Sequence, residues 1–138
     1  MSSMVKITVP GKPEFLNLCN EAAVTVSAEL GFDVDTVEEI GMAVFEACKF
    51  LTCHESDCWC SSYNVEFSYE EYSGLIVNIT TNGEYSIEKS RHICMDCPNE
   101  GDLGVQIIKS IMDNVEIDRE YDDGSGRGKR ITLVKNLC

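Results

Sequence analysis

The chain has 138 residues, of which 43% are hydrophobic and 25% are charged. This length suits one folded domain, residues 1–138, and the composition is that of a globular protein rather than a disordered chain or a coiled coil. Because 24 Asp and Glu outnumber 11 Lys and Arg, giving a formal net charge of −13, the balance argues against a nucleic acid as the partner.

The start of the chain lacks the features of a targeting segment. Residues Met1 to Lys6 have neither the basic beginning nor the apolar core of a signal peptide, and no apolar run nears the ~20 residues of a membrane span. We therefore expect a cytoplasmic protein that makes no contact with a membrane. In that compartment the eight cysteines are expected as reduced thiols, metal ligands or redox groups rather than as a disulfide framework.

The first half of the chain predicts one strand and two helices. Val5–Val9 alternates with the period of a half-buried strand, and Pro10-Gly11 ends it. A helix is expected from Glu14 to Gly31, with its buried face at Phe15, Leu18, Ala22, Val26 and Leu30. A second helix is expected from Asp35, as the N-cap, to about Cys53, with its buried face at Val37, Ile40, Val44, Ala47 and Leu51.

The second half predicts four strands and a third helix. Tyr63–Tyr69 and Leu75–Ile79 alternate around a turn and are expected to form a β-hairpin, followed by a long loop at Asn82–Asp102. Val115–Tyr121 and Lys129–Val134 are expected as a final strand pair. Between the loop and this pair, a helix is expected to carry on one face Leu103, Ile107, Ile111 and Val115.

The order β-αα-ββ-loop-α-ββ favours the α+β class. Strands and helices segregated in this way pack as a two-layer α/β sandwich, with a mixed, mostly antiparallel sheet covered by helices on one face.

Three segments carry a family pattern. The second helix contains Glu46-Ala47 and is followed by His54, a strand runs into Thr81-Asn82-Gly83, and Gly101-Asp102-Leu103-Gly104 precedes Met112-Asp113. Together they span nearly the whole chain and resemble the anti-sigma-factor serine kinases. These kinases are a branch of the histidine-kinase-like ATPase (GHKL) superfamily, which has the Bergerat ATP-binding fold.

The resemblance gives roles to two positions on the second helix. Glu46 matches the family carboxylate that polarises an attacking hydroxyl, and Phe50 stands where the family has an asparagine that holds magnesium. A spacing of four residues puts both on one helix face. Phenylalanine has no oxygen for the metal. The alternative interpretation of Glu46 is an ordinary solvated helix residue.

The other two segments match the family positions that bind nucleotide. Thr81 replaces an aspartate that accepts a hydrogen bond from the adenine amino group, while Gly83 keeps the family glycine. A neutral hydroxyl accepts this bond less strongly, so base recognition is expected to be weakened and not abolished. Gly101, Leu103 and Gly104 match the family's Gly-x-Leu-Gly, and glycines at a helix start let backbone amides face a phosphate.

Two groups of cysteines depart from the family pattern. One follows the second helix, and the other lies in the Asn82–Asp102 loop, which the resemblance makes the lid of the ATP site. If the fold is as expected, both flank one pocket. The candidate ligands of zinc or an iron–sulfur cluster are Cys53, Cys58, Cys60, Cys94 and Cys97. The alternative is plain reduced thiols, and Cys19, Cys48 and Cys138 are expected to pack or to lie exposed.

The leading hypothesis is an anti-sigma-factor-type regulator that acts by protein–protein binding, with weak or lost use of magnesium and ATP. Phosphoryl transfer depends on a metal that neutralises charge, so losing the metal's amide is expected to reduce the rate. The resemblance implies a sigma factor or an anti-sigma-factor antagonist as partner, and a homodimer. Two alternatives stay open: an active ATP-dependent protein serine kinase in which Glu46 or Asp102 takes over magnesium, and a redox or metal sensor that uses the cysteines.

Overall fold

The computed structural model describes residues 2–51, 62–70, 74–82, 103–122 and 127–137. The helical elements are η1 (Pro13–Phe15), a short 3-10 helix, and three α-helices, α1 (Leu16–Glu29), α2 (Val34–Leu51) and α3 (Leu103–Ile111). The strands are β1 (Ser2–Pro10), β2 (Ser62–Glu70), β3 (Gly74–Asn82), β4 (Asn114–Asp122) and β5 (Arg127–Asn136). The predicted element order is confirmed.

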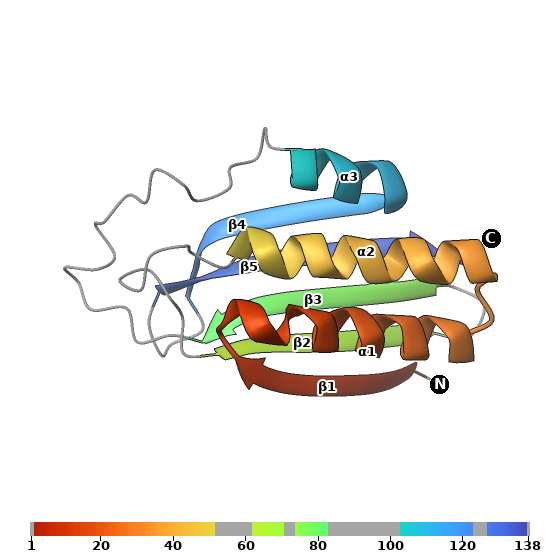
Figure 1. The fold of residues 1–138 in the computed structure, drawn as a ribbon, viewed down its shortest axis with the longest axis horizontal. Helices are drawn as coiled ribbons and strands as arrows, with labels where there is room; N and C mark the ends of the chain where they lie inside the picture. The colour runs from red at the N-terminus through yellow and green to blue at the C-terminus, as the bar shows by residue number, and fades with distance from the viewer. Residues whose placement is uncertain (1, 52–61, 71–73, 83–102, 123–126, 138) are drawn as a thin grey trace.

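The strands form one sheet in the order β1-β2-β3-β5-β4. All four pairings in this sheet are antiparallel, so the sheet has no mixed part among the described strands. Phe67, Val77 and Leu133 lie opposite one another on β2, β3 and β5 and are fully buried. Figure 1 shows the three α-helices on this one side of the sheet, which confirms the predicted two-layer α+β sandwich.

The buried face of the first helix matches the predicted one in part, since Phe15, Ala22, Val26 and Leu30 pack half-buried against the core. Leu18 is 49% exposed, and the residues that α1 buries are Leu16, Cys19, Ala23 and Ser27. The reason is a close approach to α2, since a Cβ added at Gly41 would lie 2.7 Å from side-chain atoms of both Asn20 and Val24. Small side chains suit such a contact better than the large ones that dominate the helical pattern.

The second helix follows the prediction along its length but not at its start. Its predicted face is buried throughout. The N-cap is Asp33 and not Asp35, because the Thr36 amide donates a hydrogen bond of 2.8 Å to Asp33 Oδ1. The Val37 amide also donates to the Asp33 carbonyl at 2.9 Å. An aspartate two residues earlier thus begins the helix.

The third helix is shorter than predicted, and its buried face matches the prediction in part: Ile111 is buried and Ile107 packs half-buried against the core. Val115 belongs to β4, and the buried residues of α3 are Val105, Ile108 and Ile111. The helix ends because Asp113 is already held by β5. Its amide donates to the Val134 carbonyl at 2.8 Å, and its Oδ2 accepts from the Asn136 amide at 2.6 Å.

Both predicted strand pairs are confirmed. In the first, β2 and β3 pair from Ser62 opposite Asn82 to Glu70 opposite Gly74. Gly74 has a φ of 138°, and a Cβ there would lie 2.5 Å from the Lys135 carbonyl oxygen of β5. A side chain is therefore excluded where β3 begins. In the second pair, β4 and β5 are regular except for a register shift between Asp118 and Tyr121.

Candidate functional site

The segments that carry the family pattern end at the same side of the molecule. In Figure 1 the C-terminal end of α2, the end of β3 and the start of α3 all point toward one side, where the grey traces begin. These ends carry Glu46 and Phe50 on α2, Thr81 on β3, and Leu103 and Gly104 on α3. The fold thus gathers five of the predicted site residues from three distant parts of the sequence.

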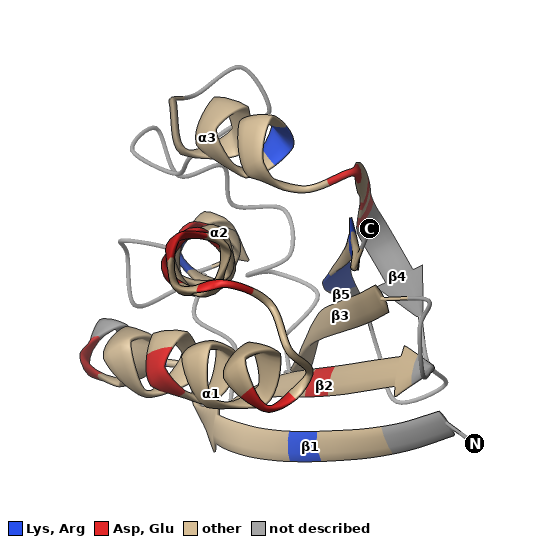
Figure 2. Cartoon of the chain, turned by 90° about the vertical axis from the view of Figure 1, so that its right-hand side faces the viewer, with Lys and Arg blue, Asp and Glu red and all other residues tan. Residues whose placement is uncertain are grey.

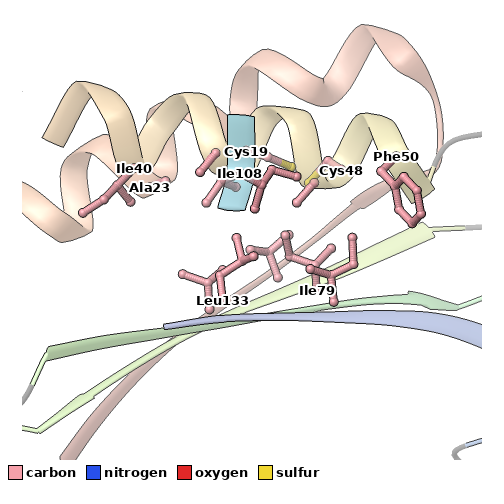
Figure 3. Packing of buried hydrophobic residues seen from close by; sticks show 14 of the residues in the cluster. Cys19, Ala23, Ile40, Cys48, Phe50, Ile79, Ile108 and Leu133 are labelled. Carbon is pink, nitrogen blue, oxygen red and sulfur yellow. The ribbon is translucent and has the colours of Figure 1, made fainter. Parts of the chain in front are cut away.

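Phe50 is part of the hydrophobic core. Its side chain is 5% exposed and belongs to the cluster between the helices and the sheet. In Figure 3 its ring leaves the end of α2 on the side of the sheet, beyond Ile79. Magnesium takes oxygen ligands. An aromatic ring packed in the core supplies none.

Thr81 is bound into the sheet through its side chain. It is 4% exposed, and its Oγ1 accepts a hydrogen bond of 2.9 Å from the Lys129 amide. The backbone pairing of β3 with β5 ends one residue earlier, at Thr80 opposite Arg130. The hydroxyl therefore extends the contact between the two strands, and one of its two acceptor positions is already used.

Glu46 lies against the first turn of α3. Its side chain is half-buried, and a Cβ added at Gly104 would lie 2.5 Å from Glu46 Oε2 and 3.5 Å from Glu46 Cδ. The helix start carries amides without partners in the helix and a positive dipole end, both of which favour a nearby carboxylate. Leu103, beside this contact, is 70% exposed and so is accessible to a ligand or a partner.

Several predicted site residues lie outside the described residues. These are Gly83, Gly101 and Asp102, the lid loop at 83–102, and the five candidate metal ligands Cys53, Cys58, Cys60, Cys94 and Cys97. Within the described ranges, no group of three or more His, Cys, Asp or Glu side chains is arranged to hold a metal ion. The zinc and iron–sulfur hypotheses therefore stay predictions.

Two further cysteines pack in the core, as expected. Cys19 of α1 and Cys48 of α2 are both fully buried, and Figure 3 places them on facing sides of the two helices. A hydrogen bond with Cys48 lowers the pKa of the Cys19 thiol, against the opposing effect of burial. This pair is a structural contact between the helices.

The sequence did not reveal a groove between α1 and α2. It is an open groove with a volume of about 420 Å³ and is lined by Asn17, Asn20, Val24, Glu38, Met42 and Phe45. The only local signal is Gly41, the glycine in the middle of α2 that lets α1 come close. Finding the groove requires knowing where the two helices cross, which no periodicity provides.

The fold and the gathered segments define a class of protein. An open antiparallel sheet of five strands with three described α-helices on one face is consistent with the Bergerat fold of the histidine-kinase-like ATPases. Of the helices that the structure describes, none is both long enough and apolar enough to span a membrane.

Comparison with known proteins supports a particular branch of this class. A protein from Oceanobacillus iheyensis is 26% identical over 128 residues, which cover 85% of this chain and 80% of the relative. A protein from Halalkalibacterium halodurans is 29% identical over 125 residues, 82% and 74% of the two chains. A third, from Bacillus licheniformis, is 24% identical over 130 residues, 87% and 80% of the two chains.

Each of these relatives is named Serine-protein kinase RsbW. No protein-family model matches the chain. The relatives support an RsbW-like anti-sigma-factor kinase family for this protein, in agreement with the resemblance of its three segments. They lend no support to the redox or metal sensor.

Proposed function

We propose that this chain is an anti-sigma-factor-type regulator that acts by binding a protein partner, with weak or lost use of magnesium and ATP. On this proposal residues 1–138 work as one domain. The RsbW relatives, which are named serine-protein kinases, support the family role. The observation that carries the weakened use of ATP is the burial of Phe50, which is 5% exposed in the core of the domain.

The burial of Phe50 bears on the metal. Catalysis of phosphoryl transfer consists mostly of positioning and of neutralising charge on the phosphates by a bound metal. A ring that packs in the core cannot ligate magnesium, and it cannot move aside without exposing apolar surface to water. We therefore expect the chain to bind ATP with magnesium more weakly than a chain with the family asparagine would, while its fold stays stable.

Thr81 supports a parallel weakening of base recognition. A carboxylate at this position would accept the adenine amino group strongly. The Thr81 hydroxyl is neutral, 4% exposed and already accepts from the Lys129 amide at 2.9 Å. An adenine amino group would have only the second acceptor position of this buried, neutral hydroxyl.

The partner is proposed to be a sigma factor or an anti-sigma-factor antagonist with a basic surface. The chain has a formal net charge of −13, and α1 and α2, whose acidic residues are red in Figure 2, expose Glu21, Glu29, Asp35, Glu38 and Glu39. On these two helices Lys49 is the basic residue. Complementary charge speeds association and selects partners more than it strengthens binding, so salt is expected to slow complex formation.

Calorimetric titration with ATP, in the presence of magnesium and again with a chelator, tests the nucleotide part. We expect no magnesium-dependent binding of the wild type. Binding at about 10 µM or tighter that is lost in the chelator would overturn the proposal. Thr81→Asp serves as the matched variant, because it restores the family carboxylate and leaves Phe50 unchanged. It should strengthen recognition of the adenine base without restoring the dependence on magnesium.

Size-exclusion chromatography with purified sigma factors and antagonists of the source organism tests the partner part. A stable complex that forms without ATP is the expected result. If none of them co-elutes with the folded chain at low salt, binding without nucleotide is refuted.

A second candidate, an active protein serine kinase, is favoured by the position of Glu46. Its carboxylate lies half-buried against the start of α3, where it could accept a proton from a substrate serine. This candidate predicts transfer of phosphate from ATP to a cognate protein, abolished in Glu46→Gln. Absence of transfer by the wild type with its identified partner would remove it.

A further inference from the structure

The contact between α2 and α3 at Gly104 is tighter than a side chain would permit. A Cβ at position 104 would lie 2.5 Å from Glu46 Oε2, a separation that van der Waals repulsion excludes. Alanine at 104 and the present position of the Glu46 carboxylate therefore exclude each other. We infer that Gly104 is a positioning residue for Glu46: its missing side chain makes the space in which the carboxylate lies.

The role of Glu46 in chemistry rests on the proposed family function, but its placement by Gly104 does not. The resemblance assigns the glycines of this segment to a phosphate. The geometry adds a second reason for glycine at 104, one that operates without any ligand. Gly104 stands in the first turn of α3 (Leu103–Ile111), where the position of the Glu46 carboxylate leaves no room for the Cβ of an alanine.

The core determines which partner of this contact would move. Behind Glu46, α2 is anchored by Val44 and Ala47, and behind Gly104, α3 is anchored by Val105 and Ile108, all 1% exposed or less. Separating the helices would open this packed interior, which is unfavourable. The Glu46 carboxylate, by contrast, is the end of a flexible side chain. We expect Gly104→Ala to displace the carboxylate while the helices keep their positions.

The displacement matters because the carboxylate lies at the positive end of α3. There the first amides of the helix and its dipole stabilise a negative charge, and this effect decays within one turn. Once pushed away, the Glu46 carboxylate would leave the start of α3 and turn toward solvent. On the second candidate, an active protein kinase, a general base kept in one place acts better than one that samples several, and Gly104 would then serve the reaction through Glu46 without touching the substrate.

A cycle of variants tests the contact without any assay of activity. Gly104→Ala is made in the wild type, in Glu46→Gln and in Glu46→Ala, and the thermal midpoint of each protein is measured. Glutamine has the same shape and keeps the clash, whereas alanine removes it. We expect Gly104→Ala to raise the midpoint by about 3 °C more in Glu46→Ala than in the other two backgrounds. An equal change in all three would overturn the inference.

Carbon NMR of the side-chain carboxyls gives the positional readout. The Glu46 resonance is assigned by its loss in Glu46→Gln. It should shift in Gly104→Ala while the backbone spectrum away from the first turn of α3 stays unchanged. Ser110→Ala, a neutral change at an exposed position of the same helix, is the matched control and should leave the Glu46 resonance in place.

An unmoved Glu46 resonance in Gly104→Ala would refute the inference whatever the chain does with ATP. Where the wild type transfers phosphate, Gly104→Ala should lower kcat with little change in the KM for ATP. A rise in the KM for ATP with kcat unchanged would indicate a phosphate contact instead. Loss of partner binding or of nucleotide binding in the wild type concerns only the proposed function.

Discussion

The Phe50→Ala variant measures whether Phe50 is a core residue or a movable one. The side chain is 5% exposed and packs in the cluster between the helices and the sheet. Truncating a buried phenylalanine to alanine costs about 3 to 5 kcal/mol through lost burial and the cavity that remains. Because Phe50 lies in the last turn of α2 (Val34–Leu51), where relaxation is easier, we expect about 3 kcal/mol, at the lower end of that range.

Urea unfolding followed by circular dichroism gives the value. The midpoint should fall while the slope of free energy against urea stays the same, as expected when stability changes and compactness does not. Phe45→Ala is the matched control: it removes the same side chain from the same helix, but Phe45 is half-buried and lines the α1–α2 groove. We expect it to cost about half as much.

A loss below about 1 kcal/mol for Phe50→Ala, or no more than for Phe45→Ala, would refute the reasoning. The ring would then contribute little to the core. It could swing out to admit phosphates and magnesium, and the argument that Phe50 weakens the use of ATP would fail with it.

Three other changes test the described contacts. Thr81→Val should cost about 1 to 2 kcal/mol and speed hydrogen exchange of the Lys129 amide, which loses its acceptor; unchanged exchange would contradict the bond. Gly41→Ala should cost about 1 to 3 kcal/mol in urea, because its Cβ would lie 2.7 Å from atoms of α1; equal or higher stability would refute that close crossing. A hydrogen bond from the Thr36 amide lowers the pKa of Asp33 below its ordinary 3.8. The contribution of this carboxylate to folding stability is therefore complete above pH 3.8 and is lost as the pH falls through the lower pKa of the folded state. Relative to Asp33→Asn, stability should therefore decline only below about pH 4, and a difference that is constant across acid pH would refute the assignment.

The sequence predicted the type and order of the elements because each carries a clear period. Alternation marks the strands, and the face of α2 is apolar along its whole length. The apolar period predicts the buried faces of α1 and α3 only in part, because it does not fix which residues lie innermost. Leu18 and Leu103 are large yet exposed, while Cys19 and Ala23 are small yet fully buried. Which side of a helix meets its neighbour depends on how the helices cross, and that is a property of the whole fold.

The sequence predicted which residues belong to the candidate site better than it predicted their contacts. The family pattern located Glu46, Thr81 and Gly104, and the fold brings their segments to one side of the molecule. The hydrogen bond of Thr81 with Lys129 depends on the register of β3 against β5, strands joined through α3 and β4. The approach of Glu46 to Gly104 depends on the packing of α2 on α3. Neither leaves a local trace in the sequence.

The positions that depart from the family pattern differ physically from those that keep it. Phe50 and Thr81, the two departures among the described residues, are 5% and 4% exposed and are engaged with the core and the sheet. Glu46 and Gly104, which keep the pattern, are only partly buried. A buried polar or charged group needs partners, whereas an apolar or locally bonded one stabilises the fold. Each departure thus places at a family ligand position a group suited to the scaffold, and under the proposed function these two changes would stabilise the fold while nucleotide binding declines.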